Sequence, residues 1–116
     1  MTIPDRLVDL LIAELDDVER AGGVAYYAEP VVAAGSNVAV PGLDLEAPWE
    51  GLLGFVDREP TANWAHSCRY VLINTATREV VSIEAKVPPF GPADDRRWRV
   101  AYKAPSVPEA AVANPD

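Results

Sequence analysis

The sequence has one cysteine, one histidine and one methionine among its 116 residues. A lone Cys68 cannot form an intrachain disulfide, so the small secreted scaffolds that depend on disulfides are excluded. A closed structural zinc site needs about four Cys or His ligands. Cys68 and His66 are the only such residues, so this class is nearly excluded as well. We therefore expect neither a metal ion nor another cofactor.

Long hydrophobic runs are also lacking. No apolar stretch approaches the ~20 residues that cross a bilayer. A secretory leader has a basic start, an apolar stretch and a cleavage site of small residues. The start of this chain carries acids and lacks that pattern. We expect a soluble, cytoplasmic protein without a membrane partner. At 49% hydrophobic residues the chain can build one core, which we place in a single domain over 1–104. A flexible Pro/Ala-rich tail is expected over 105–116.

Basic residues are scarce: 10 Lys and Arg stand against 18 Asp and Glu, for a net charge of −8. Nucleic acids and anionic membranes would be repelled on average. The most basic stretch, residues 96–99, directly follows Asp94 and Asp95. We therefore expect no nucleic-acid partner. The acidity can serve solubility alone, or it can attract a basic protein.

The pattern of apolar residues over 4–20 predicts one amphipathic helix. Thr2 is a suitable N-cap and Pro4 suits the first turn. Gly22 and Gly23 should end the helix, because glycine readily adopts the C-cap conformation. The apolar positions are Leu7, Leu10, Leu11, Leu15 and Val18, and Glu14 is the only break.

The rest of the chain predicts strands. Short strands are expected over 24–28, 38–40 and 52–56, with an extended piece over 31–34 and a loop over 41–51. Alternation predicts a hairpin of 65–73 and 79–87, and a last strand from Arg97 to Lys103. The fold class is therefore α+β, with an N-terminal helix packed on an antiparallel sheet of four or five strands. This architecture resembles cystatin-like and similar helix-on-sheet rolls, which host inhibitors, binding modules and enzymes alike.

The chemistry-bearing residues gather in one predicted strand. Side chains two apart in a strand share a face, so Trp64, His66, Cys68 and Tyr70 should line one side and are candidates for a pocket. An imidazole beside a thiol can lower the thiol pKa and make it a nucleophile. Against a catalytic role, the base in thiol enzymes usually comes from another segment. Buried cysteines are also commonly inert.

A second candidate site is an acidic zone over residues 44–59. Its carboxylates could contact a basic partner, and Trp49 and Phe90 lie in proline-flanked loops where aromatic side chains can anchor one. The candidate partner-binding residues are Asp44, Glu46, Trp49, Glu50, Asp57 and Phe90.

The leading hypothesis is a small acidic protein-binding module, such as an inhibitor, an immunity protein or an accessory subunit, that acts on another protein. Its partner could be basic. One alternative is a small-molecule pocket or thiol-dependent enzyme that uses the face of Trp64, His66, Cys68 and Tyr70. Another is a self-associating protomer, and hence a homo-oligomer. No recognised catalytic motif is present, so an enzyme is less expected than a binding protein.

Overall fold

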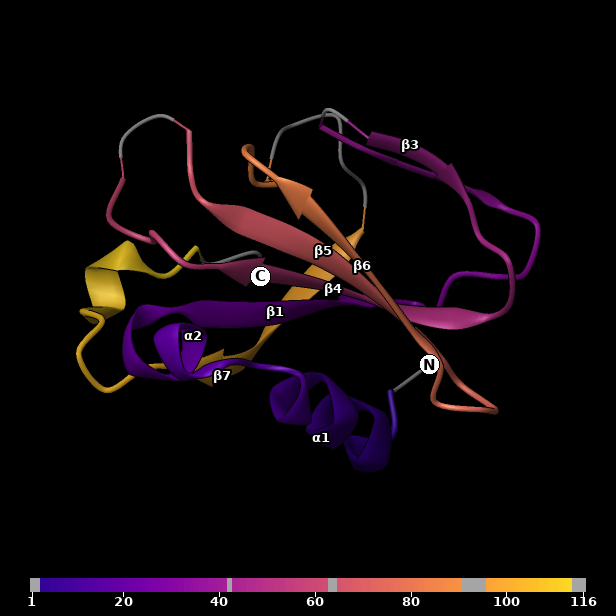
Figure 1. Cartoon of the computed structure of the whole chain (residues 1–116), viewed down its shortest axis with the longest axis horizontal. Helices are drawn as coiled ribbons and strands as arrows, with labels where there is room; N and C mark the ends of the chain where they lie inside the picture. Colours follow the sequence, from indigo (N-terminus) through magenta and orange to yellow (C-terminus); the bar gives the residue numbers. More distant parts are fainter. Residues whose placement is uncertain (1–2, 42, 63–64, 91–95, 114–116) are drawn as a thin grey trace.

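A five-stranded antiparallel sheet with strand order β6-β5-β4-β1-β7 forms the centre of the computed structural model (Figure 1). The structure describes residues 3–41, 43–62, 65–90 and 96–113. The sheet strands are β1 (Val24–Glu29), β4 (Gly51–Asp57), β5 (Cys68–Asn74), β6 (Val80–Ala85) and β7 (Arg97–Lys103). A separate hairpin consists of β2 (Asn37–Val40) and β3 (Leu43–Glu46). The helices are α1 (Asp5–Ala13), α2 (Asp17–Gly22) and the short 3₁₀ helix η1 (Glu109–Ala111). The predicted α+β class, with an N-terminal helix on an antiparallel sheet, is confirmed.

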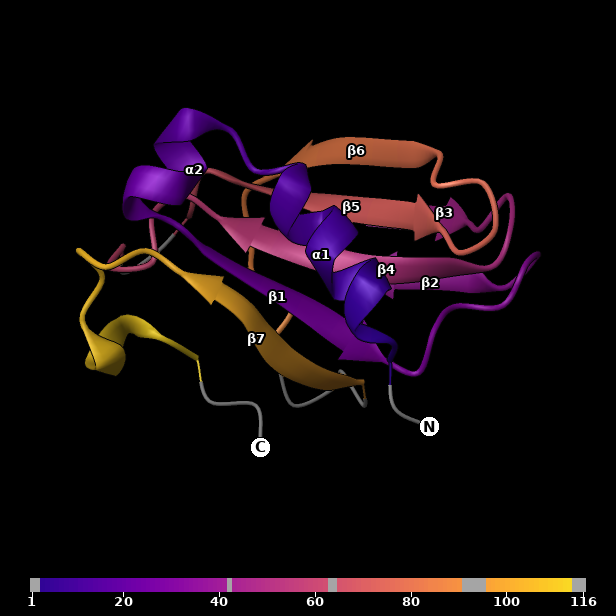
Figure 2. The same cartoon turned by 90° about the horizontal axis from the view of Figure 1, so that it is seen from below.

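Helix α1 covers one face of the sheet (Figure 2). Leu7 and Leu11 of α1 and Leu15 just after it are buried against that face. Gly54 of β4 lets the helix approach closely, because a Cβ there would lie 2.8 Å from a methyl of Leu11. The side chains that receive the helix are Ala25, Leu52, Val56, Val71 and Ile73.

The opposite face is covered by the β2–β3 hairpin and by the chain that follows β7. Figure 1 shows the hairpin on the far side of the sheet from α1 and α2. Val107 is 5% exposed, and the Ala113 backbone N–H donates to the Tyr26 hydroxyl at 3.0 Å. Residues expected to belong to a flexible tail therefore contact the domain as far as Ala113, and the boundary at residue 105 stays a prediction. The large side chains of this core are Tyr26, Phe55, Tyr70 and Trp98.

The single helix predicted over 4–20 is wrong, because the chain forms two helices with a break at residues 14–16. Asp16 caps α2: its carboxylate accepts from the Glu19 N–H, while the Glu19 carboxylate accepts from the Asp16 N–H. Arg20 donates to the carbonyls of Leu15 and Ile12 at the end of α1. Pro4 is the N-cap of α1, and the predicted cap Thr2 lies outside the described residues. No helix in the described ranges is long and apolar enough to cross a membrane.

Two strand predictions also need correction. The loop predicted over 41–51 contains β3, which pairs with β2 in register from Asn37↔Glu46 to Val40↔Leu43. The acids of β3 hide it from pattern analysis, because β-propensity depends on the neighbouring strand and on burial. Strand β5 begins at Cys68 and not at Ala65, so His66 lies outside the strand, although its N–H donates to the Lys86 carbonyl at 2.7 Å. In the stretch 31–34, Val32 forms an isolated bridge with Gly51.

Candidate functional site

Two of the four predicted pocket residues, Cys68 and Tyr70, lie together inside the core on the hairpin side of the sheet. Cys68 is fully buried and Tyr70 is 2% exposed. The Tyr70 ring lies 5.2 Å from that of Phe55, and its hydroxyl donates to the Val87 carbonyl at 2.8 Å. Trp64 lies outside the described residues. The alternation of side chains therefore holds from Cys68 onward, where β5 begins.

The His66 imidazole forms a hydrogen bond with the Asp57 carboxylate at the end of β4. Its Nδ1 lies 2.9 Å from Asp57 Oδ1 and 2.8 Å from Oδ2. The Asp57 carboxylate also accepts from the Glu59 backbone N–H at 2.9 Å. Asp57 is only 4% exposed, so it is not part of the solvent-exposed acidic surface that the sequence suggested. This hydrogen bond instead holds the end of β4 against His66, which lies two residues before β5.

The position of Cys68 disfavours the thiolate form of its side chain at neutral pH. Burial, together with the nearby negative charge of Asp57, raises the pKa of the Cys68 thiol to about 11. Asp57 lies opposite Cys68 in the β4–β5 ladder. Because the thiolate is the nucleophilic form, a thiol held in its protonated state does not support thiol-dependent catalysis. In the described ranges, no three His, Cys, Asp or Glu side chains are grouped to hold a metal ion.

A buried carboxylate that the sequence analysis did not single out organises the helix side of the sheet. Glu19 of α2 is fully buried. Its carboxylate accepts from Arg69 Nε and Nη2, both at 2.9 Å, and from Arg58 Nε at 3.0 Å. Arg69 comes from the middle of the sheet and Arg58 follows β4. This cluster therefore fixes α2 against two segments that lie about 40 and 50 residues later in the chain.

The same arginines extend the network to β6. Arg58 donates to both oxygens of Glu84, at 2.7 and 2.9 Å, and Arg69 Nη1 donates to the Ser82 hydroxyl. The hydrogen bond from Arg58 lowers the pKa of Glu84, and the two carboxylates raise the pKa of Arg58. Among the described residues, every buried side-chain polar atom has a hydrogen-bond partner. The cluster is therefore internally satisfied and structural. The sequence signal that could have found it is the Asp16-x-x-Glu19 capping box.

The exposed carboxylates of residues 44–50 lie on and just after the β2–β3 hairpin. Asp44 and Glu46 share the outer face of β3, whereas Leu45 between them points toward the sheet. Glu50 is exposed, and its carboxylate accepts from the Thr75 hydroxyl at 2.7 Å. We call Asp44, Glu46 and Glu50 the acidic segment. It belongs to residues 21–57, which contain five acids and no Lys, Arg or His.

The two predicted aromatic anchors are packed against the domain. Trp49 is half-buried against the hairpin-side core. The Phe90 ring lies 4.8 Å from that of Tyr26 and 5.9 Å from that of Trp98. Of the six predicted partner-binding residues, the structure therefore exposes the three carboxylates of the acidic segment. It packs or buries Trp49, Asp57 and Phe90.

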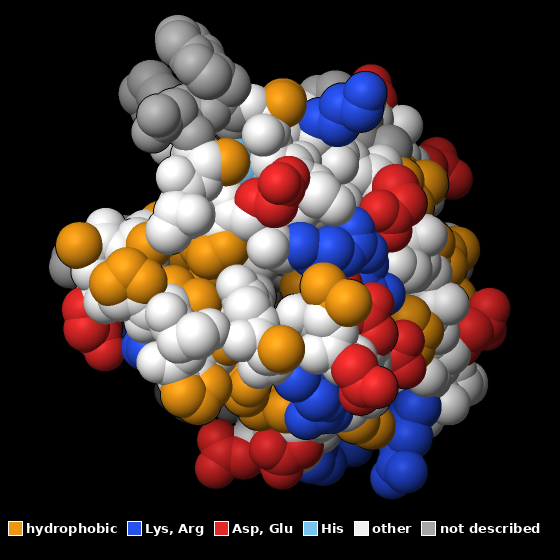
Figure 3. Space-filling view, turned by 60° about the vertical axis from the view of Figure 1, so that its left-hand side comes forward, with side chains coloured by type: hydrophobic (Ala, Val, Ile, Leu, Met, Phe, Trp, Pro, Cys, Tyr) orange, Lys and Arg blue, Asp and Glu red, His pale blue; other side chains and the backbone are white. Residues whose placement is uncertain are grey.

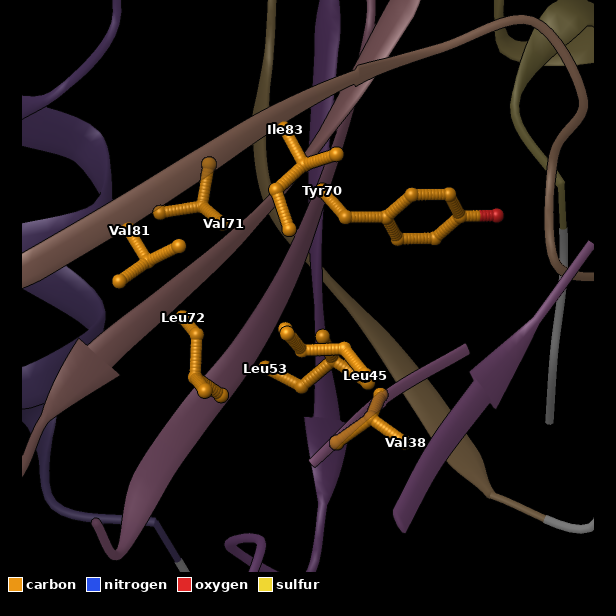
Figure 4. Close-up of a pocket in the computed structure, with 8 residues that line it drawn as sticks. All are labelled: Val38, Leu45, Leu53, Tyr70, Val71, Leu72, Val81 and Ile83. Atoms are coloured by element: carbon orange, nitrogen blue, oxygen red, sulfur yellow. The ribbon is translucent and has the colours of Figure 1, made fainter. Parts of the chain in front are cut away.

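A narrow apolar pocket lies between the hairpin and the sheet (Figure 4). Its cavity volume is about 10 Å³, far below the ~300–1,000 Å³ typical of small-molecule sites. Figure 4 shows side chains from β2, β3, β5 and β6 converging on it, with the Tyr70 hydroxyl turned away. The pocket is lined by Val38, Leu45, Leu53, Tyr70, Val71, Leu72, Val81 and Ile83.

A wider groove lies between the end of α2, the β4–β5 loop and residues 106–108. It encloses about 720 Å³ of space that includes open solvent. Arg58 lines it, but each of its guanidinium nitrogens already donates to Glu19, Glu84 or Ser67. Figure 3 shows acidic and basic side chains side by side at this end of the molecule. The charges there are largely mutually compensated, so the groove presents no charge of a single sign to a ligand.

Comparison with known proteins does not identify the chain: no family model, no curated protein and no solved structure matches it.

Proposed function

We propose that this protein is a small, non-enzymatic binding module that acts on a basic protein, as an inhibitor, an immunity protein or an accessory subunit. The observation that carries the proposal is the acidic segment. Its three carboxylates are exposed on a stretch of 37 residues, 21–57, without a positively charged side chain. Such a surface favours encounter with a basic partner.

The contacts of the arginine and lysine side chains outside residues 21–57 support the same proposal. Arg58 and Arg69 bind Glu19, and Arg99 binds Glu29 at 2.6 Å. Arg20 donates to helix carbonyls, and Lys103 donates to the carbonyls of Ala104 and Val107. Near the hairpin, Arg96 donates to the Ala39 carbonyl on β2. Six of the ten Lys and Arg side chains therefore bind groups within the molecule, whereas Arg6, Arg78 and Lys86 are exposed. The carboxylates of β3 face outward.

The alternative functions have less support. A thiol-dependent enzyme would need an ionisable, accessible Cys68, and the pKa of this buried thiol is raised to about 11. A drug-sized ligand would need more space than the narrow pocket offers. A second copy of the chain carries the same charge of −8, which opposes self-association. A single reduced, buried cysteine is compatible with a cytoplasmic location, which we retain as part of the proposal.

The proposal is tested by affinity capture from the source cells with two variants of equal charge. In the first, the acidic segment is neutralised by Asp44→Asn, Glu46→Gln and Glu50→Gln. In the matched control, three exposed acids of the helical region are neutralised by Asp9→Asn, Glu14→Gln and Asp17→Asn. Each variant changes the net charge from −8 to −5, because three negative charges are removed.

We expect the wild-type chain and the control to retain a common basic protein at about 0.05 M salt, and the acidic-segment variant to lose it. Retention should fall at about 0.5 M salt, where charges are screened beyond a few ångströms. Equal retention by the two variants would contradict the proposal, since net charge alone would then explain binding.

A further inference from the structure

Strand β6 is an open and regular edge of the main sheet. It is the first strand in the order β6-β5-β4-β1-β7, so among the described residues its only strand neighbour is β5. The pairing runs without a register shift from Cys68↔Ala85 to Ile73↔Val80. Figure 2 shows β6 along one margin of the sheet. A regular edge presents a row of backbone N–H and C=O groups that can pair with another strand.

The other edge is less suited to pairing. The register of β7 against β1 shifts between Ala25 and Tyr26, and such irregularities twist an edge and interrupt its ladder. The end of β7 is also occupied by the chain that follows, since Lys103 donates to the carbonyls of Ala104 and Val107. The two edges therefore differ, and β6 is the better template for an added strand.

The apolar pocket opens beside this edge. Val81 and Ile83 of β6 and Leu45 of β3 line it and are half-buried. Figure 4 shows that Val81 and Ile83 lie on the face of the sheet that Leu45 also contacts. A strand added next to β6 would place every second side chain on this side of the sheet. Apolar residues at those positions would continue the partly covered apolar surface.

The acidic segment lies near one end of the same edge. The Thr75 hydroxyl, in the β5–β6 turn, donates to the Glu50 carboxylate at 2.7 Å. Glu79, which is exposed, immediately precedes β6. This end of the edge therefore carries the exposed carboxylates of Glu50 and Glu79 beside one exposed base, Arg78. Further along β6, Glu84 is already bound by Arg58.

From these observations we propose that an extended segment of the basic partner adds a sixth strand to the sheet along β6. The segment alternates apolar residues, which face Val81, Ile83 and Leu45, with lysine or arginine. The inference rests on the proposed function, because it takes the partner to be basic, and it adds the mode of recognition. Strand addition supplies affinity through backbone hydrogen bonds and specificity through alternate side chains.

The test uses a defined probe, a capped ten-residue peptide of alternating lysine and valine, titrated into the ¹⁵N-labelled chain. We expect shifts and slowed amide exchange in β6 and not in β7. Two further peptides carry N-methyl groups on either all valine or all lysine amides. Only one edge of the added strand can face β6, so one of the two should bind about tenfold more weakly than the other.

Side-chain contacts are tested with Val81→Lys on β6 against Val100→Lys on β7, where Val100 is 43% exposed. The β6 variant should lose peptide binding and the β7 variant should keep it. Circular dichroism checks that both variants are folded. Failure of the peptide to bind, shifts centred on β7, or equal binding of the two methylated peptides would overturn strand addition.

The proposed function has a separate readout. If neutralising the acidic segment abolishes peptide binding while N-methylation has no effect, the charged surface is supported and the added strand is wrong. If the peptide binds β6 equally well after neutralisation, the charge basis of the proposed function is wrong and the edge remains a binding site.

Discussion

Replacing Glu19 by glutamine should remove the charge that organises the helix side of the molecule. The substitution keeps the size of the side chain. In the wild-type chain, the two carboxylate oxygens accept hydrogen bonds from Arg58, Arg69 and the Asp16 backbone N–H. Glutamine offers only one amide oxygen for these donors. Both guanidinium groups would stay largely buried, at 17% and 10% side-chain exposure. Glu84 still pairs with Arg58, whereas Arg69 loses the carboxylate that both its Nε and its Nη2 contact.

The expected loss is large. Removing one partner of a buried ion pair typically costs about 3–5 kcal/mol, because a buried charge is left uncompensated. Glutamine retains the volume and one acceptor, so we expect the lower end, ~3 kcal/mol. A domain has only about 5–15 kcal/mol of stability, and each kcal/mol corresponds to roughly 4 °C at this chain length. The melting temperature of Glu19→Gln should therefore fall by about 12 °C.

The control is Glu84→Gln, which removes a carboxylate bound to Arg58 but 70% exposed. Exposed pairs contribute at most ~1 kcal/mol. Urea denaturation at pH 7, followed by far-UV circular dichroism, measures the free energy of unfolding of both variants. If Glu19→Gln costs no more than Glu84→Gln, the buried cluster is not a source of stability and its role in fixing α2 is refuted.

Three further outcomes are expected. The Cys68 thiol, with its pKa raised to about 11 by burial, should react with a maleimide only after denaturation; rapid labelling of the native chain at pH 7 would contradict its burial. Gly54→Ala should cost about 1–3 kcal/mol, because its methyl would lie 2.8 Å from a leucine of α1. The control Gly22→Ala, which meets nothing within 4 Å, should be neutral or stabilising in urea melts. Finally, the pKa of Glu84 is lowered below 4.5 by Arg58, so the unfolded chain binds more protons in acid. The stability from this pair is present above pH 4.5 and lost as the pH falls through the folded-state value. Glu84→Gln should therefore show a shallower loss of stability between pH 6 and 3, and an unchanged slope would refute the coupling.

The pattern of apolar and polar residues predicted those helices and strands in which the same face is buried along the whole element. Strand β6 alternates because its apolar face is partly covered. Strand β7 was found from the same pattern, but its register shift against β1 breaks the alternation of burial and leaves Val100 43% exposed. The helical periodicity over 4–20 was visible, but the break was not. It depends on Glu19 turning inward to meet Arg58 and Arg69, which lie 39 and 50 residues later in the chain. A capping box in the middle of an amphipathic pattern is the local sign of such a break.

The candidate site was harder to predict, because the position of a polar residue depends on its partner. Asp57 is the last residue of β4 and Glu50 directly precedes the same strand, yet Asp57 is buried and Glu50 is exposed. Asp57 is buried because His66 and the Glu59 N–H lie within 3 Å of its oxygens. No spacing rule encodes that pairing, which requires the β4–β5 loop to fold back on itself. Phe90 likewise packs inward because three aromatic rings surround it.

The distribution of charge argues for recognition more strongly than the net charge does. Solubility requires only that acids outnumber bases, wherever they lie. Here most of the bases are paired within the molecule, as with Arg69 on Glu19, although Arg6, Arg78 and Lys86 are exposed. The longest stretch without a base carries Asp44 and Glu46 on its outer face. That face lies on a hairpin whose inner residues line the same pocket as β6, the regular edge of the sheet. If acidity served solubility alone, neutralising three acids on the hairpin or three on the helices would have the same effect on binding. The comparison of those two variants therefore separates the two explanations, because only recognition makes the location of the charges matter.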